Sequence, residues 1–446
     1  MKNPRKINKD SLEYRVQLEL LGRAIERSLP KVNSENLTTN GEICFPSNLL
    51  AWRGLLREDG TNQSSRNILE YYLRRKTYET IDFSDPDILR KVNERVIVGL
   101  RRNVRPNLKS CISWPSQIQR CSLQDGRVSL FLNRTSVIGS AIEQALAQGT
   151  SYGRRAVTSK SVCIKINEDV DSDLTTARLR LVRQVSEQLL RFQGFSIVES
   201  DADFLYLLTS KSEGKTDECC RRCVCGVVKN QDSNTKETSQ SWETYVGNKM
   251  EELSSLGETK SSERDNLRSI AEAVATFELL SVKPSKPVFV GSSKEPDRAH
   301  SSSKGNEGSF VLYNASRISA ILERFEEEKL LGKYPSLTDV EHVDFGLLNQ
   351  EEEWELVYNF IVGFPEMIEN CVQCGTQLET CPHSLCLFLS RLSQKFSVYY
   401  RRIRILTEGR DHLIPTMMAR LHLLRALRVV VNNSLEILNI VPVGHM

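Results

Sequence analysis

Nine basic residues lie between Arg391 and Arg428, where only Glu408 and Asp411 are acidic, so this stretch carries a local charge of +7 while the whole chain carries +3. Within it, Tyr399 and Tyr400 directly precede a run rich in arginine. Cationic side chains bind the phosphates of an RNA hairpin, and its exposed bases stack on aromatic rings or arginine planes. The stretch therefore predicts an RNA-binding surface. Its basic residues are Arg391, Lys395, Arg401, Arg402, Arg404, Arg410, Arg420, Arg425 and Arg428.

A solvated basic helix face is the alternative interpretation, because long charged side chains cover many helices that never touch nucleic acid. Tyr313 and Arg317 add a second candidate pair. They lie one helical turn apart and can share a face that binds RNA, or Tyr313 can be a core ring with Arg317 as its surface neighbour. Spacing alone leaves both alternatives open.

Two cysteine clusters contain the residue types that bind zinc, but the arrangement of these residues is not that of usual zinc sites. The first packs its thiols into one short segment, which rarely closes a tetrahedral site. The second has better ligand types, but its last cysteine falls at a core position of a predicted helix. We expect no bound metal, and elemental analysis for zinc tests this. The clusters are Cys219, Cys220, Cys223 and Cys225, and Cys371, Cys374, Cys381, His383 and Cys386.

Other catalytic patterns are weak. Gly214, Lys215 and Thr216 resemble the end of a phosphate-binding loop, but Thr209 stands where the first glycine would be. No histidine occurs in the first 299 residues, so no imidazole can act there as a general base. Three later histidines suit packing or surface positions better than catalysis: His342, His412 and His422.

Composition indicates a multidomain protein of the cytosol. The chain has 446 residues, of which 39% are apolar and 26% charged, and this length suggests about three domains. No apolar run is long enough to span a membrane, and the first residues lack the apolar core of a secretory signal. We therefore expect a cytoplasmic protein whose 12 cysteines form no disulfides.

The elements that must position these residues follow from periodicity. An amphipathic helix is predicted for 11–29, within an N-terminal α/β domain spanning 1–150. In that domain, alternating apolar residues predict a strand at 126–133, and a helix follows and ends at Gly149. From Ser161 onward, a strand, a helix and a short strand occupy about 40 residues, the size of a parallel βαβ unit.

The rest of the chain contains two polar segments, followed by a region with helical periodicity. Residues 211–264, inside a second unit at 155–290, are rich in Ser, Thr, Glu and Lys and are predicted to be a disordered insertion. Residues 291–308 are rich in Ser and Gly and predict a linker. From 309 to 446, four amphipathic patterns joined by short turns predict an all-α helical bundle. The expected fold class is α+β multidomain.

The helical bundle resembles the DALR anticodon-binding domain of arginyl-tRNA synthetases. The segment GNEGSFVLYNASRI at 305–318 matches the family pattern of Gly-Asn, an aromatic residue, Tyr and Arg-Ile without a gap. FPEMIE from Phe364, PHSLCLFLSRLSQKFSVYY from Pro382 and ARLHLLRALRVVVNNSLEILNI from Ala419 are similar to the next three helices in order. Met446 ends the chain as a methionine ends the synthetases, but VPVGHM departs from the proline and arginine that precede it there.

Residues 148–197 resemble the opening strand, signature turn and helix of the synthetase nucleotide-binding domain. Where the family has Leu-His-Val-Gly-His-Leu-Arg, this chain has Leu-Thr-Thr-Ala-Arg-Leu-Arg at 174–180. Both histidines that contact ATP are replaced, and Lys249 and Met250 of the second signature are followed by two glutamates. The resemblance implies a degenerate, truncated Rossmann-like remnant in a class I synthetase-like pseudoenzyme, without ligase chemistry and without a cofactor.

Over the whole chain, the layout resembles the animal DALR anticodon-binding domain-containing proteins, non-catalytic relatives of arginyl-tRNA synthetase. The resemblance implies a protein that recognises the anticodon arm of arginine tRNA and serves as the recognition subunit of a tRNA 3-methylcytidine methyltransferase. The alternatives are an arginine-tRNA ligase with a rewired signature and a protein-only scaffold. The candidate RNA-binding residues are Tyr399, Tyr400, Arg401, Arg402, Arg404, Arg420, Arg425, Arg428, Tyr313, Arg317 and Met446.

Overall fold

The computed structural model describes residues 29–56, 65–71, 118–211, 220–256, 264–291, 307–374, 378–407 and 410–441. The chain divides into two compact units, of which the first comprises Met1–Ala141 with His342–Tyr358 and the second comprises Ile142–Glu341 with Asn359–Met446. The helix predicted for 11–29 lies outside the described residues apart from Leu29, and so does most of the predicted linker. The second unit joins the predicted Rossmann-like and helical parts, so the domain boundaries drawn from sequence stay predictions.

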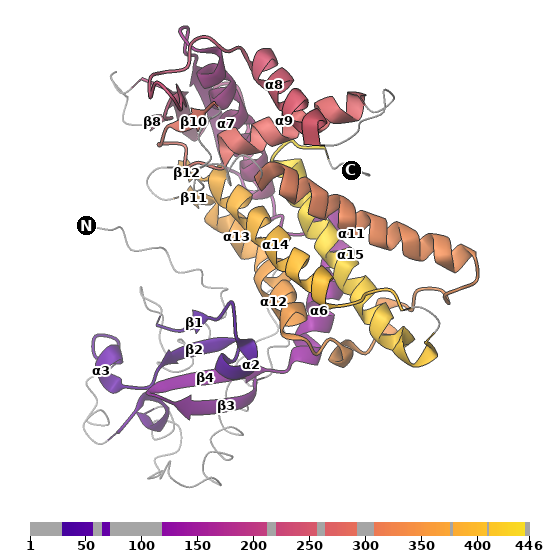
Figure 1. The fold of residues 1–446 in the computed structure, drawn as a ribbon. Coiled ribbons are helices and arrows are strands. Elements are labelled where there is room, and N and C mark those ends of the chain that lie inside the picture. Colours follow the sequence, from indigo (N-terminus) through magenta and orange to yellow (C-terminus); the bar gives the residue numbers. More distant parts are fainter. Residues whose placement is uncertain are drawn as a thin grey trace. The chain divides into compact units, whose positions relative to one another are not determined.

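A four-stranded antiparallel sheet forms the first unit (Figure 1). β1 (Lys31–Val32) pairs with β2 (Ile43–Pro46), β2 with β4 (Arg127–Leu132), and β4 with β3 (Ile118–Gln124). Asp125 and Gly126 join β3 to β4, and their φ angles of 49° and 73° are those that a two-residue hairpin turn requires. The predicted strand and the helix that follows it are confirmed as β4 and α6 (Arg134–Gln148).

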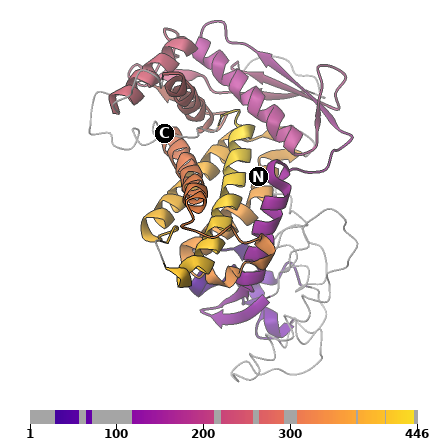
Figure 2. The ribbon, with the colours of Figure 1, turned by 90° about the vertical axis from the view of Figure 1, so that its right-hand side faces the viewer.

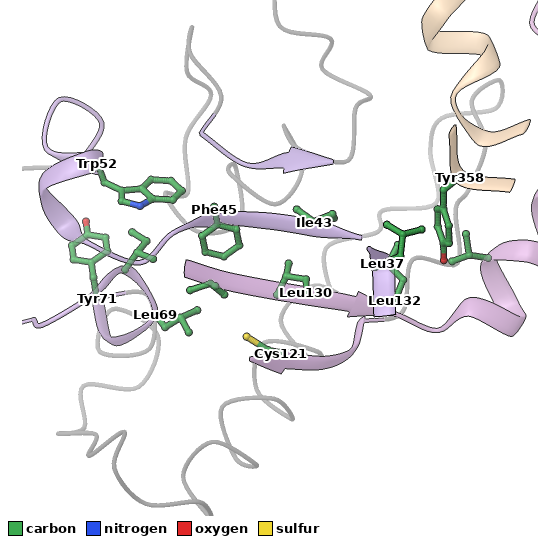
Figure 3. Packing of buried hydrophobic residues seen from close by; sticks show 13 residues of the cluster. Leu37, Ile43, Phe45, Trp52, Leu69, Tyr71, Cys121, Leu130, Leu132 and Tyr358 are labelled. Atoms are coloured by element: carbon green, nitrogen blue, oxygen red, sulfur yellow. The ribbon is translucent and has the colours of Figure 1, made fainter. Parts of the chain in front are cut away.

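The core of this unit is aromatic and aliphatic (Figure 3). Phe45 of β2 meets Trp52 of α3 (Leu49–Trp52) edge to face, with ring centroids 5.8 Å apart. The Trp52 indole nitrogen donates to the Pro46 carbonyl at 2.7 Å, which satisfies its polar atom inside the core. Leu37 of α2 (Leu37–Asn40) is fully buried beside Tyr358.

A segment distant in sequence completes the first unit. The Glu351 carboxylate, at the start of α12 (Glu351–Leu356), accepts hydrogen bonds from the backbone N–H groups of Leu37 and Thr38. The Arg134 guanidinium lies 3.7 Å from the ring centroid of Trp354. Residues from the helical half of the sequence therefore stabilise the N-terminal sheet, which sequence analysis did not predict.

A parallel sheet organises the first part of the second unit. Its strand order is β6 (Ser196–Ile197), β5 (Ser161–Asn167), β7 (Phe204–Thr209), β8 (Cys220–Val224). α7 (Asp173–Phe192) connects β5 to β6 and lies along the sheet (Figure 2). The Ser172 hydroxyl caps α7 by accepting from the Thr175 N–H at 3.2 Å. The predicted βαβ unit is confirmed.

The predicted disordered insertion at 211–264 is wrong over the residues that the structure describes. They contain β8, β9 (Val228–Asn230) and α8 (Trp242–Leu256), and β9 pairs in parallel with β10 (Val288–Val290). α8 also holds Lys249 and Met250, which the sequence analysis placed in the disordered stretch. Residues 212–219 and 257–263 lie outside the described part.

The prediction failed because few apolar residues, far apart in sequence, order this segment. Val228, Tyr245 and Val246 are buried in a cluster with residues of α7 and of α9 (Arg264–Leu280). Apolar side chains recur along α8 at helical spacing, a pattern that the polar average of the window concealed. They are Trp242, Tyr245, Val246, Met250 and Leu253.

The predicted helical bundle is confirmed. In the second unit it contains α11 (Glu307–Leu330), α13 (Phe364–Asn370), α14 (Pro382–Arg402) and α15 (Ile414–Ile437). α12 belongs to the first unit, and a π-helical stretch at Val357–Val362 follows it in the sequence. A short hairpin of β11 (Val372–Cys374) and β12 (Leu378–Thr380) precedes α14. α11, α14 and α15 pack on one another (Figure 1), and the ring of Phe388 lies 5.4 Å from Phe360 and 5.9 Å from Phe364, centroid to centroid.

No helix within the described ranges combines the length and apolar character needed to cross a membrane.

Candidate nucleic-acid interface

Two tyrosines and one arginine from two helices form an exposed cluster. The guanidinium carbon of Arg317 in α11 lies 4.3 Å from the ring centroid of Tyr313 and 4.5 Å from that of Tyr400 in α14. Arg317 also donates a hydrogen bond to the Tyr313 hydroxyl. Tyr313 is 45% exposed and Tyr400 is 40% exposed, so both rings keep open surface. We name Tyr313, Arg317 and Tyr400 the Tyr-Arg cluster.

Helix geometry explains how the chain builds this cluster. Tyr313 and Arg317 are four residues apart on α11 and therefore share a face, as the spacing predicted. α14 packs against α11, and this packing brings Tyr400 to the same guanidinium. Phe396 lies one turn before Tyr400, with the ring centroids 6.2 Å apart, and is fully buried beneath it. The sequence indicated each part but not that the two candidate groups meet.

Tyr399 is not part of this surface, although it was predicted to bind RNA. Its side chain is fully buried, and its ring centroid lies 6.4 Å from that of Phe396. Neighbouring helical residues point about 100° apart, so only one of two consecutive tyrosines can face outward here. We therefore correct this assignment: Tyr399 is a core residue.

Four predicted arginines gather where α14 ends and α15 begins. Arg401 and Arg402 occupy the last turn of α14, Arg404 follows directly, and all three are exposed. Arg420 of α15 is partly exposed and donates from Nη1 to the Arg404 carbonyl at 3.0 Å. This hydrogen bond holds the backbone after α14 against α15, so the arginines of both helices lie on neighbouring surface.

Arg425 and Arg428 follow on α15 and are partly exposed. Arg425 Nη1 lies 3.4 Å from His422 Nδ1, and His422 Nε2 lies 2.7 Å from the Thr338 carbonyl. Burial lowers the pKa of His422, which favours the neutral ring that donates from Nε2 and accepts at Nδ1. His422 is buried and serves packing, as the sequence analysis expected.

Several of these cations lack acidic neighbours. Within the described ranges, Arg401, Arg425 and Arg428 have no carboxylate within ion-pair distance. Surface arginines elsewhere are paired, such as Arg183 with Glu187 at 2.6 Å. The basic surface is thus left to attract external anions. Met446, which completes the predicted set, lies outside the described residues.

The positions that resemble the synthetase signature turn are occupied by structural contacts. Thr175 and Thr176 are buried in the first turn of α7. The Thr175 hydroxyl accepts from the Val228 N–H at 3.1 Å, and the Thr176 hydroxyl donates to the Asp169 carbonyl at 2.9 Å. Both threonines therefore fasten neighbouring loops to α7.

Arg178, one turn further, is fully buried and bound by backbone carbonyls. Nη1 donates to Gly226 at 2.5 Å and Lys286 at 2.8 Å. The remaining nitrogens donate to Leu279, Val282 and Lys283 at 3.2 to 3.3 Å. Burial lowers the pKa of Arg178 to about 10, while Cys225 and Cys223 oppose this shift. One guanidinium thus ties the turn before β9, the end of α9 and the segment before β10 to α7.

The carboxyl ends of β5 and β7 lie where parallel sheets commonly bind nucleotides, because the connection from β5 runs to β6 on one side and the connection from β6 runs to β7 on the other. Asp169 lies at this edge and is 6% exposed. Its carboxylate accepts from Lys236 Nζ at 2.5 Å and from the Ser210 hydroxyl at 2.6 Å. The hydrogen bonds from Lys236 and Ser210 lower the pKa of Asp169 against the opposing effect of its burial. Lys236, in the loop after β9, therefore forms an ion pair with the acidic residue at this edge of the sheet.

Comparison with known proteins identifies the helical part. Residues 311–446 match the family model of the DALR anticodon binding domain. The C-terminal helices carry a DALR domain. The mouse protein named DALR anticodon-binding domain-containing protein 3 is 35% identical over 184 residues, which cover 40% of this chain and 33% of the mouse protein. The zebrafish protein of that name is 32% identical over 188 residues. The match thus spans about a third of the length of these curated relatives.

Arginyl-tRNA synthetases share the fold beyond the DALR domain. The arginine-tRNA ligase of Borreliella burgdorferi is 27% identical over 255 residues, covering 57% of this chain and 40% of the ligase. The Thermus thermophilus arginyl-tRNA synthetase structure aligns over 99% of this chain and 100% of its own, with a TM-score of 0.59 and 10% identity. The Plasmodium falciparum enzyme gives a TM-score of 0.58 over 98% of each chain at 9% identity. The expected synthetase-like α+β fold is confirmed.

The two cysteine clusters do not assemble a metal site among the side chains that the structure describes, where no group of three or more His, Cys, Asp or Glu is arranged as ligands. In the DALR domain, Cys371 and Cys386 are buried, and burial raises the pKa of the Cys371 thiol to about 12. Outside that domain, Cys225 is buried and Cys223 is partly exposed. Zinc analysis of the whole protein remains the test of the metal prediction.

Proposed function

We propose that this chain is a non-enzymatic cytoplasmic protein that binds tRNA through its DALR domain and recognises the anticodon arm of arginine tRNA. The Tyr-Arg cluster carries the proposal, because two exposed rings sharing one guanidinium offer planar surfaces to unpaired bases. The arginines at the end of α14 and the start of α15 supply charge for the adjoining phosphates. Arg401 and Arg428 are not neutralised by carboxylates of the described residues.

The proposal also includes a partner. The resemblance to DALR anticodon-binding domain-containing proteins supports a role as the recognition subunit of a tRNA 3-methylcytidine methyltransferase. In this role the chain holds the anticodon arm and the partner supplies the chemistry. Co-purification of such an enzyme, identified by mass spectrometry, is the expected result. Its absence from the purified complex contradicts this part alone and leaves tRNA binding standing.

The absence of ligase activity is supported by the contacts at the carboxyl ends of β5 and β7. The acidic residue at this edge is engaged by Lys236 and Ser210, and α7 uses Thr175, Thr176 and Arg178 to hold backbone. By the resemblance to the synthetase signature turn, Thr175 and Arg178 correspond to the two histidines that contact ATP in that family. An arginine-tRNA ligase with a rewired signature is therefore the weaker alternative.

RNA sequencing with three matched variants tests the central claim. The full chain is affinity-purified, its bound small RNA is sequenced, and binding to the enriched tRNA is titrated. Tyr400→Ala should weaken binding about 5- to 150-fold, since stacking on one base contributes roughly 1–3 kcal/mol. Phe289→Ala, an equally exposed aromatic residue on β10, should leave binding unchanged.

Tyr399→Ala, measured beside Tyr400→Ala, distinguishes the effect of a core tyrosine from that of a surface tyrosine. It removes a fully buried ring, so it should lower the free energy of unfolding by roughly 3 kcal/mol or more. Tyr400→Ala should change stability by less than about 1 kcal/mol. A purified protein without enriched tRNA would favour the protein-only scaffold. A Tyr400→Ala variant with full affinity for the tRNA would remove the Tyr-Arg cluster from the interface.

A further inference from the structure

One side of α14 is exposed along most of the helix. Exposed residues recur there at spacings of four and three, which places them on a single stripe of an α-helix. Leu389, Leu392 and Phe396 lie on the opposite side and are buried in the core. We name the exposed residues the α14 stripe, which comprises Leu387, Arg391, Gln394, Val398 and Arg401.

The charge of this helix has one sign. Four of the 21 residues of α14 are Lys or Arg, and none is Asp or Glu. Among the residues that the structure describes, Arg391 and Arg401 have no carboxylate within ion-pair distance. The Glu307 carboxylate of α11 approaches the helix at the buried Ser390, whose hydroxyl donates to it at 3.4 Å. The α14 stripe therefore keeps positive charge that attracts external anions.

The α14 stripe and the Tyr-Arg cluster lie on different sides of the same helix. Successive helical residues are about 100° apart, so Tyr400 lies about 100° from Arg401 and about 160° from Val398. Tyr400 contacts Arg317 of α11 on its side. The two surfaces adjoin at the last turn of α14, where Arg401 stands. An RNA hairpin bound at the cluster therefore meets the stripe at this turn.

The side chains of the stripe suit the backbone of RNA better than its bases. The stripe has no aromatic ring on which a base could stack. Arginine binds phosphate, and the Gln394 amide can hydrogen-bond a ribose 2′-hydroxyl. From Arg391 to Arg401 the helix rises about 15 Å, which is longer than one nucleotide step. The stripe can thus follow a strand over several phosphates.

A protein partner fits this surface less well. Stable protein interfaces have an apolar core from which charged residues are depleted. Leu387 and Val398, the large apolar residues of the stripe, are 49% and 36% exposed. They lie about 16 Å apart along the helix, with Arg391 and Gln394 between them. The stripe therefore has no continuous apolar patch.

We propose that the α14 stripe binds the phosphate backbone of an RNA stem, with Arg391 as a phosphate contact on a side of α14 different from that of the Tyr-Arg cluster. This inference rests on the proposed function and adds a direction to it. The loop of the hairpin lies at the cluster, and its stem extends from the last turn of α14 toward Leu387.

Arg391→Ala tests the phosphate contact in salt titrations of the full chain with arginine tRNA. The slope of log affinity against log salt should fall in magnitude by about 0.7 to 0.9, and the affinity at 0.1 M salt should fall roughly sixfold. Arg391→Lys should keep the parent slope, because an ammonium group also neutralises a phosphate. Arg183→Ala on α7, whose side chain pairs with Glu187 at 2.6 Å, should change neither quantity.

Gln394→Lys adds a cation to the stripe and should have the opposite effect. The slope should steepen by about 0.7 to 0.9, and binding should tighten. Gln184→Lys adds the same charge at an exposed position of α7 and should leave the slope at the parent value. Each substitution is at an exposed residue, so thermal unfolding should show stability within about 0.5 kcal/mol of the parent.

Two RNA probes locate the contact on the stem. The probes are the isolated anticodon stem-loop of arginine tRNA and the same loop without its stem. Arg391→Ala should weaken binding of the stem-loop only, whereas Tyr400→Ala should weaken binding of both probes. Equal effects of Arg391→Ala on both probes would contradict a stem contact.

The outcomes separate this inference from the proposed function. If Arg391→Ala and Gln394→Lys keep the parent slope while Tyr400→Ala weakens binding, the inference is overturned and tRNA binding at the cluster stands. If Arg391→Ala instead removes a co-purifying protein at an unchanged slope, the stripe binds an acidic protein and the inference is also overturned. A parent chain that binds no tRNA overturns both.

Discussion

Arg178 is a buried residue whose hydrogen bonds are all to the backbone. Its charge lies in the interior and is solvated by five backbone carbonyls instead of a carboxylate. A buried cation is tolerated where its donors are all satisfied, and removing it leaves several carbonyls without a partner. The guanidinium is suited to this task because its planar fork carries five N–H donors.

Replacing Arg178 should therefore destabilise the second unit severely. Arg178→Met, which keeps the approximate length, should lower the free energy of unfolding by roughly 3–5 kcal/mol because the carbonyls lose their donors. Arg178→Lys should recover only part of this loss, since an ammonium has three donors. Urea unfolding followed by circular dichroism measures both.

Arg180→Ala is the control for this prediction. It lies two residues away on α7, and its partner is Glu168 at 2.6 Å on the surface. Its loss should cost less than about 1 kcal/mol. Equal unfolding midpoints for Arg178→Met and Arg180→Ala would show that the carbonyl contacts contribute little.

At the scale of elements, the end of α14 is a helix terminus that concentrates positive charge. Arg401 and Arg402 stand in its last turn, where cations also interact favourably with the helix dipole. Each phosphate that a cation neutralises contributes about 0.7 to 0.9 to the slope of log affinity against log salt. Four to six engaged residues predict a slope of roughly −3 to −5.

Arg401→Ala with Arg402→Ala should flatten this slope by about 1.4 to 1.8 and weaken tRNA binding most at low salt. Fluorescence titrations at several salt concentrations measure the slope. Arg268→Ala with Arg324→Ala removes two exposed arginines that pair with Glu272 and Glu328, and it should leave the slope unchanged. An identical slope for the first double variant and the parent removes the α14 terminus from the interface.

Elements with a strong apolar periodicity were predictable from the sequence, whereas short strands with few apolar residues were not. The strand at Ser161–Asn167 and the helix beginning near Leu174 were found because their apolar residues recur with regular periods. β8 and β9 have five and three residues and are ordered by partners elsewhere in the chain. Such strands carry little local pattern, so composition misled the prediction there.

The candidate site was predictable in its residue types and not in its assembly. Arg317 and Tyr313 share a face by spacing alone, but only the packing of α14 on α11 shows that Tyr400 joins them. Likewise, no pattern in the sequence separates Tyr399 from Tyr400, because both lie in a basic, aromatic run. Burial distinguishes them.

At the scale of the whole molecule, the fold is that of arginyl-tRNA synthetases, and Asp169, beyond the carboxyl end of β5, is engaged by Lys236. We expect no arginine-dependent exchange between ATP and pyrophosphate in the purified full-length protein, because α7 presents no histidine and Lys236 covers Asp169. An authentic arginyl-tRNA synthetase assayed in parallel is the positive control. Exchange above the background of a protein-free reaction would restore the ligase alternative.

The buried guanidinium in α7 also makes this helix intolerant of substitution at two positions. Histidines at Thr175 and Arg178 would remove the Thr175 hydrogen bond to β9 and leave the carbonyls of Gly226 and Lys286 without their donor. Either substitution alone should therefore lower the stability of the second unit. A reactive group could be placed in this turn of α7 only if new donors were supplied to the same carbonyls.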